Sequence, residues 1–251
     1  MSDLEEMIWR SVHSGELDTR PPEISVHEGQ RLQLRILDRW IKQGEALAGY
    51  KIGLTSGEAR DAFGVGIRPF GFILQSRVLG SGDCVQRNQI GRMGIENELV
   101  FRVGESISAT GITREAAREA IEAVAPAFEI NQRRLLSIPG GQASNGIRVA
   151  DNLSQWGIVT GGFVDLDQDF DNLVVSLSCN GESVQEVSAN GHIDDHFTSI
   201  AALINRLHDY GRGLSRGDLI ITGSFTKQPI DSPGRWCGNF GEIGQVELQV
   251  V

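Results

Sequence analysis

The chain has 251 residues, and its 33 acidic and 23 basic side chains give a formal net charge of −10. A hydrophobic fraction of 40% and a charged fraction of 22% are typical of globular proteins and exclude a wholly disordered chain. The sequence has no basic stripe of the kind that binds nucleic acid. Its apolar runs are far shorter than the ~20 residues that span a membrane.

The cysteines indicate the compartment. Cys84, Cys179 and Cys237 are odd in number, widely spaced and form no CxxC pair. We therefore expect reduced thiols in a cytoplasmic protein, and neither a disulfide framework nor a zinc site. Residues 1–10 are acidic and lack the basic and apolar regions of a signal peptide.

The first sixty residues are expected to be largely helical. The first helix is indicated by apolar residues at the spacing of one helix face, namely Leu4, Met7, Ile8 and Val12. A second periodic stretch covers residues 27–43, and the segment 18–22, which contains a proline pair, separates the two. A short helix is expected at residues 56–63.

Beyond residue 64, glycines separate short runs rich in β-forming residues. Strands are expected at residues 71–78, 95–103, 126–130, 157–160, 173–179, 184–187, 218–225 and 245–251. Asn180 and Gly181 predict a type I′ hairpin, because both central residues of that turn need positive φ. Helices are expected at residues 113–124 and 197–210. This order predicts an α+β fold on a largely antiparallel or mixed sheet.

Two glutamates in the expected strand 95–103 form the first candidate site. Side chains alternate between the faces of a strand, so Glu96 and Glu98 project together, away from the face that carries Asn97. Such carboxylates repel each other unless protons or a cation compensate them, and a hard divalent ion would do so. The alternative is a strand with one hydrated face.

Two further charged residues lie in apolar surroundings. Glu129 follows Phe128 and precedes Ile130, where an uncompensated charge would be costly, although simple alternation could also turn it outward. Lys51 lies among apolar residues, glycines and small hydroxyls. Loss of water generally lowers the pKa of a lysine, which lets it exchange protons near neutrality; the alternative is an ordinary surface lysine.

The only histidines close together are His192 and His196. Their i, i+4 spacing is compatible with metal ligation, but the expected helix begins after them. The sequence therefore favours a loop or capping role.

Five segments occur in one order along the chain. They are GYKIGLTS at 49–56, IENELVF at 95–101, PAFEI at 126–130, ADN at 150–152 followed by Ser154, and GDLIITGSFT at 217–226. This order resembles the 2-oxopent-4-enoate hydratase / 4-oxalocrotonate decarboxylase family, a branch of the fumarylacetoacetate hydrolase superfamily. The resemblance implies a mixed β-sandwich roll with flanking helices, in a homo-oligomer. Residues 1–60 would be a helical segment packed on a catalytic domain of residues 61–251.

The resemblance also implies a metal-dependent site. Glu96, Glu98 and Glu129 match the positions that hold Mg²⁺ or Mn²⁺, and Lys51 matches the lysine that acts as acid and base beside the metal. The residues that the resemblance places near the substrate are Leu54, Ser154, Ser224 and Thr226.

The implied activity is that of a lyase acting on a small 2-oxo or 2-hydroxydienoate acid in aromatic or related catabolism. Hydration is the first expectation. The alternatives are vinylogous decarboxylation, carbon–carbon hydrolysis of an acylpyruvate, and keto-acid binding without catalysis. The hydratases typically carry aspartates where this chain has Gly66, Pro69 and Gln132. The decarboxylase branch also lacks the second of these aspartates, so decarboxylation stays open.

Overall fold

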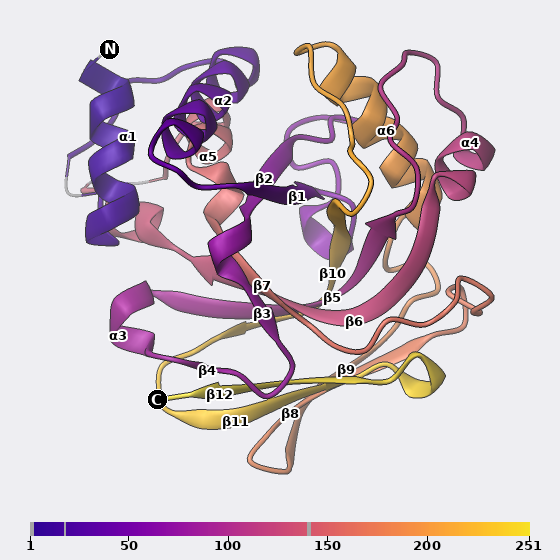
Figure 1. Cartoon of the computed structure of the whole chain (residues 1–251). Coiled ribbons are helices and arrows are strands. Elements are labelled where there is room, and N and C mark those ends of the chain that lie inside the picture. Colours follow the sequence, from indigo (N-terminus) through magenta and orange to yellow (C-terminus); the bar gives the residue numbers. More distant parts are fainter. Residues whose placement is uncertain (1–2, 18, 140–141) are drawn as a thin grey trace.

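Figure 1 shows the computed structural model of the protein, which describes residues 3–17, 19–139 and 142–251. Most helices lie on one side of a seven-stranded sheet, and a five-stranded sheet lies on the other side. The strand orders are β2-β1-β10-β5-β6-β7-β3 in the larger sheet and β4-β12-β11-β8-β9 in the smaller. None of the helices in the described ranges combines the length and the apolarity that crossing a bilayer requires.

The larger sheet contains β1 (Leu47–Ile52), β2 (Phe70–Leu74), β3 (Val78–Gly80), β5 (Met93–Val103), β6 (Ile121–Gln132), β7 (Gln155–Thr160) and β10 (Leu219–Pro229). The smaller contains β4 (Cys84–Val85), β8 (Val174–Cys179), β9 (Glu182–Ser188), β11 (Gly234–Asn239) and β12 (Gln245–Val250). The α-helices are α1 (Asp3–Ser14), α2 (Val26–Lys42), α3 (Arg87–Ile90), α4 (Arg114–Glu119), α5 (Asn145–Ala150) and α6 (His196–His208). Parallel and antiparallel pairs both occur, which confirms the predicted α+β fold with mixed sheets.

Strand β5 separates two apolar clusters. Its residues Ile95, Leu99 and Phe101 are buried in the main core. On the opposite face, Val100 belongs to a small cluster formed by Ala48, Ile73, Val100, Ala125, Ala127, Ile158 and Ile221. These seven residues come from six strands, so the inner face of the curled sheet packs against itself. Burial of each larger member contributes about 1.5–3 kcal/mol.

Both predicted N-terminal helices are present. Ser25 caps α2 through its side chain, which accepts a hydrogen bond from the Glu28 backbone N–H, and Glu28 reciprocates. Such a cap contributes about 1 kcal/mol. Trp9 of α1 packs on Trp40 of α2 at 4.8 Å between ring centroids. Asp18, part of the predicted separating segment, lies outside the described residues.

The expectation that the first sixty residues are largely helical is wrong at one point. Strand β1 is central in the larger sheet, where it pairs in parallel with β10 and antiparallel with β2. It is buried from Ala48 to Ile52, so it shows no alternation of polar and apolar residues. The division of the chain at residue 60 remains a prediction.

Three other elements differ from the expected ones. The helix predicted at residues 113–124 ends at Glu119, because Ile121 starts β6 and β-branched residues pack well in a sheet. Residues 56–63 contain only a single 3₁₀ turn, Gly57–Ala59. The strand expected at 71–78 is divided between β2 and β3. In addition, the strands β4 and β11 and the short helices α3 and α5 lie where the sequence predicts no element. The Asn180–Gly181 hairpin is confirmed, with φ of 52° and 86°.

Candidate active site

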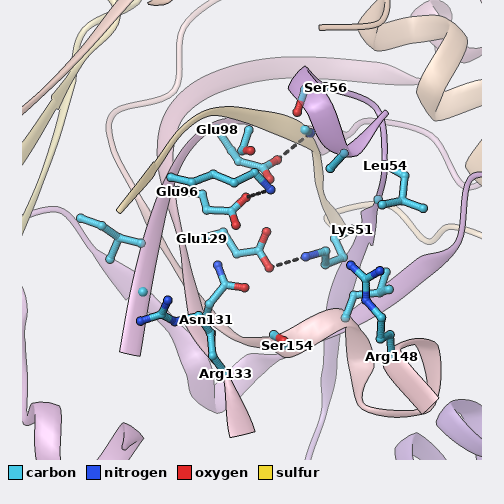
Figure 2. A pocket seen from close by; sticks show the side chains of 18 of the residues that line it. Lys51, Leu54, Ser56, Glu96, Glu98, Glu129, Asn131, Arg133, Arg148 and Ser154 are labelled. Carbon is cyan, nitrogen blue, oxygen red and sulfur yellow. Dashed lines mark hydrogen bonds and ion pairs between the residues drawn. The ribbon is translucent and has the colours of Figure 1, made fainter. Parts of the chain in front are cut away.

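Sheet register brings the three predicted carboxylates together. The antiparallel pairing of β5 with β6 places Glu96 directly opposite Glu129, and Glu98 follows on the same face of β5. One oxygen from each of the three lies within 4.8 Å of the others. Figure 2 shows them pointing into one cavity. Along the same face of β6, Ala125 and Ala127 of the small apolar cluster precede Glu129, so the acidic group lies at the end of that cluster.

Burial sets the electrostatics of this carboxylate cluster. Glu98 is 3% exposed and Glu129 is 0% exposed, which excludes the alternatives of a hydrated face and an outward Glu129. Burial raises the pKa of Glu98 well above its usual value, and repulsion by Glu129 adds to the effect. Burial also raises the pKa of Glu129, although Lys51 opposes this shift. The cluster therefore favours a compensating positive charge.

Two lysines approach the cluster from neighbouring strands. Lys51 of β1 donates a hydrogen bond to Glu129 Oε1 and is 7% exposed, so it is not an ordinary surface lysine. Lys227 of β10 lies opposite Glu96 in register, with 3.2 Å between Lys227 Nζ and Glu96 Oε2. Partial desolvation opposes the charged form of Lys227, whose side chain is 57% exposed, but the nearby carboxylates, Glu96 first among them, raise its pKa overall.

A backbone donor also holds Glu98. The N–H of Gly223 donates to Glu98 Oε2 at 2.7 Å. Gly223 has a φ of +137°, and a Cβ at this position would lie 2.2 Å from Thr55 Oγ1. Only glycine fits this conformation and this close approach. A mutation at Gly223 would therefore disturb the Glu98 carboxylate.

A cavity of about 610 Å³ surrounds the cluster, within the usual range for small-molecule sites of about 300–1,000 Å³. Its lining includes seven predicted residues, namely Lys51, Leu54, Glu96, Glu98, Glu129, Ser154 and Ser224. Thr226 is not brought to the cavity; its hydroxyl accepts a 3.4 Å hydrogen bond from the Asn97 backbone N–H within the sheet.

Strained backbone presents two of these lining residues. Leu54 and Ser154 have φ of 63° and 65°, in the left-handed region that costs non-glycine residues about 1–3 kcal/mol. Ser154 ends a run of three such residues that begins at Asn152. The Asn152 amide holds this run by accepting from the Phe72 N–H at 2.8 Å and donating to the Phe72 carbonyl at 2.9 Å.

The positions where the hydratases typically have aspartates lie outside the cavity lining, although Pro69 is adjacent to it, since its carbonyl accepts a 2.8 Å hydrogen bond from the N–H of the lining residue Gly53. Among the described residues, Gly66, Pro69 and Gln132 do not contribute to its lining. Gln132 Oε1 accepts a 2.6 Å hydrogen bond from Arg134, whose Nε lies 2.5 Å from Asp151 Oδ1 in a buried ion pair. Gln132 therefore belongs to a buried structural network.

The pair His192 and His196 does not form a metal site with other ligands in the described part of the chain. His196 is the first residue of α6, and its Nδ1 lies 2.8 Å from Thr222 Oγ1. The cap of α6 is Asp195, which accepts from the Thr198 N–H at 2.7 Å. His192 lies in the preceding loop, with Nε2 3.2 Å from the Ser224 carbonyl oxygen.

The donor set at the cluster fits a hard divalent cation. Such ions take oxygen ligands, and three carboxylates converge here. In the described structure, two buried oxygens beside the cluster lack a hydrogen-bond partner, Glu129 Oε2 and Ser224 Oγ. A buried oxygen without a hydrogen-bond partner is unfavourable. A cation bound at the cluster would provide these oxygens with the partner that the protein does not supply.

Comparison with known proteins agrees with this architecture. A family model described as "Fumarylacetoacetate (FAA) hydrolase C-terminal" matches residues 53–250. The 2-oxo-hept-4-ene-1,7-dioate hydratase of Escherichia coli is 25% identical over 236 residues, covering 92% of this chain and 88% of that protein. The 2-hydroxyhexa-2,4-dienoate hydratase of Comamonas testosteroni is 29% identical over 208 residues, covering 81% and 77%.

A solved structure resembles almost the entire chain. It is the 4-oxalocrotonate decarboxylase from Pseudomonas putida G7 complexed with magnesium and adipate, with a TM-score of 0.89 and 23% identity. The superposition covers 99% of this chain and 96% of that one, which confirms the predicted fold. Because the family model matches most of the sequence, this chain belongs to the fumarylacetoacetate hydrolase family.

Proposed function

We propose that the protein is a divalent-metal-dependent lyase that hydrates a 2-hydroxydienoate or related 2-oxo acid. The observation that supports this proposal is the convergence of Glu96, Glu98 and Glu129 at the wall of a cavity that also contains Lys51. Two of the relatives are hydratases of such acids by name.

In this proposal the three glutamates hold Mg²⁺ or Mn²⁺. A 2-oxo acid offers a carboxylate and a keto oxygen to such an ion, which when bound would stabilise negative charge on the keto oxygen. Three protein carboxylates would supply only part of the ion's oxygen shell and so would leave room for this ligand.

The side chains of the protein would orient the ligand and move its protons. Lys51 can donate a proton to a remote carbon of the dienol while the 2-hydroxyl proton passes to water and from there back to the lysine, and Glu129 holds the lysine in position through their hydrogen bond. Water then adds across the remaining carbon–carbon double bond, so the net reaction consumes one water per substrate. Leu54 and Ser154, presented by strained backbone, would line the path of the substrate chain.

Decarboxylation is the second candidate, because Gly66, Pro69 and Gln132 leave no aspartate at the three positions that hydratases typically use. The named relatives also include the 4-oxalocrotonate decarboxylase of Pseudomonas putida, 28% identical over 85% of this chain. Hydrolysis of an acylpyruvate is disfavoured. That reaction usually needs a histidine–glutamate pair, and no described histidine lines the cavity.

Turnover assays separate these candidates. Metal-loaded protein would be incubated with 2-hydroxypenta-2,4-dienoate, 2-oxo-3-hexenedioate and 2-oxohept-4-ene-1,7-dioate. Loss of dienol absorbance with formation of a 4-hydroxy-2-oxo acid supports hydration, and release of CO₂ supports decarboxylation. Metal-dependent binding of oxalate without turnover of any candidate would instead indicate a non-catalytic keto-acid-binding protein.

We also propose, as separate points, a homo-oligomeric assembly and a cytoplasmic location.

A further inference from the structure

We infer that the ligand of this cavity is a dicarboxylate, and that Arg148 binds its second carboxylate, distant from the 2-oxo acid end. The inference rests on the proposed function, since the glutamate cluster defines where the 2-oxo acid end lies. It assigns a substrate class and a specificity-determining residue to the cavity.

The charge of the cavity is the first observation. Seven described side chains that line it are charged: Lys51, Glu96, Glu98, Glu129, Arg133, Arg148 and Lys227. Four are cationic and three are anionic, so the lining has a formal excess of one positive charge, which a divalent ion would raise to three. A monocarboxylate ligand would leave two of these charges uncompensated, whereas a dicarboxylate would leave one. Electrostatic complementarity therefore favours the dicarboxylate.

The pairing of these cations is the second observation. Lys51 and Lys227 are paired with Glu129 and Glu96. The Arg148 guanidinium, in contrast, has no hydrogen bond or ion pair with any side chain that the structure describes. The Arg148 side chain lines the cavity and is exposed there, and partial desolvation of its guanidinium lowers its pKa. A partly desolvated guanidinium that has no carboxylate partner within the protein is suited to bind a carboxylate group of a ligand.

The position of Arg148 is fixed from two sides. Its guanidinium carbon lies 4.9 Å from the centroid of the Phe63 ring, which orients the flat group by a cation–π contact. Its helix, α5, is anchored by close approach to α2, since a Cβ at Gly29 would lie 2.1 Å from the Gly146 carbonyl oxygen. An arginine held in this way presents its planar fork to a carboxylate at little entropic cost.

Arg133 is the other arginine of the cavity, and it is less free. Its Nη2 donates to the Met93 carbonyl at 3.1 Å, whereas its buried Nε lacks a hydrogen-bond partner among the described residues. Figure 2 shows Arg133 beside Asn131, on the opposite side of the cavity from Arg148 and Leu54. Arg133 therefore serves as a matched control, with the same charge and the same cavity but a different position.

Calorimetric titration of the Mg²⁺-saturated protein tests the inference. The ligands are 2-oxoadipate and 2-oxopimelate, each compared with the monoacid of equal length, 2-oxohexanoate or 2-oxoheptanoate. We expect the wild-type protein to bind the better diacid roughly ten- to a hundredfold more tightly than its monoacid, as for loss of a hydrogen bond to a charged group. Arg148→Gln should remove this preference without weakening monoacid binding. Arg133→Gln removes the same formal charge from the lining, so it should reduce this preference only in part and less than Arg148→Gln does.

Two results would overturn the inference while leaving the proposed function intact. One is equal affinity of the wild-type protein for diacid and monoacid, a comparison that needs no variant. The other is an unchanged preference in Arg148→Gln, or its loss in Arg133→Gln instead. If none of the 2-oxo acids binds in a Mg²⁺-dependent manner, the proposed function itself fails, and the inference fails with it.

Discussion

Substitution of Glu98 by glutamine should weaken metal binding without lowering the stability of the metal-free protein. Carboxylate oxygens of Glu96, Glu98 and Glu129 lie within 4.8 Å of one another. At an effective dielectric constant of about 20, each charged pair at this distance repels by about 3 kcal/mol. Proton uptake by Glu98 limits this cost, because burial raises its pKa. Glutamine has the same shape and can still accept from the Gly223 N–H, so only the charge is lost.

We therefore expect Glu98→Gln to leave the free energy of unfolding of the metal-free protein unchanged or to raise it by up to about 3 kcal/mol. Mn²⁺ affinity should fall by more than about a hundredfold, since loss of a direct ligand exceeds the effect of losing a supporting residue. The wild-type protein should gain about 4 kcal/mol at a thousandfold excess of free ion over its Kd, and the variant should gain less than about 1.4 kcal/mol at the same ion concentration.

Urea unfolding with and without Mn²⁺, together with calorimetric titration, measures both quantities. Glu122→Gln is the matched control, because Glu122 is an exposed glutamate on β6 that pairs with Arg102 outside the cavity. The control should bind Mn²⁺ like the wild-type protein. Unchanged Mn²⁺ affinity in Glu98→Gln, or a loss of several kcal/mol of metal-free stability, would refute the reasoning.

Three further predictions follow from the same geometry. Lys51→Ala should lower kcat by about 10²–10⁴ while Mn²⁺ affinity stays close to that of the wild-type protein, and near-native kcat would remove the lysine from the mechanism. Gly223→Ala should cost about 1–3 kcal/mol in urea unfolding and weaken Mn²⁺ binding, because its Cβ would collide with Thr55 Oγ1 and displace the donor to Glu98; native stability would contradict this. Burial lowers the pKa of His196 from 6.5 to about 4, so the unfolded state binds its proton first as the pH falls. Between pH 7 and pH 4 the wild-type protein should lose about 3 kcal/mol more than His196→Gln, and equal losses in urea unfolding would argue against a neutral buried histidine.

Part of the site could be predicted from the sequence, because strand alternation alone puts Glu96 and Glu98 on one face. Their approach to Glu129 depends on the register of β5 with β6, and this register cannot be predicted from the spacing of residues in the sequence. Lys227 was missed for the same reason. The pairing of β10 with β5 shifts register between Ile221 and Thr226, and this shift places Lys227 opposite Glu96. Nothing in the sequence distinguishes Arg148, because most arginines in helices lie on the surface and only the structure shows that this one lines the cavity.

The fold shows a similar limit. Helices α1 and α2 could be predicted because a solvent-exposed helix carries an apolar stripe on one face. Strand β1 could not, because it is buried on both faces and its parallel partner, β10, lies about 170 residues further along the chain. At residue 121 a helical pattern gives way to β6 without a glycine or proline, so local sequence does not mark the boundary.

Anomalous scattering from a crystal soaked with Mn²⁺ and oxalate can show whether the three glutamates bind a metal ion. We expect one Mn²⁺ peak in contact with carboxylate oxygens of Glu96, Glu98 and Glu129, with oxalate between the ion and Lys51. A cavity without an anomalous peak, or a peak held by other residues while these carboxylates turn away, would contradict this expectation.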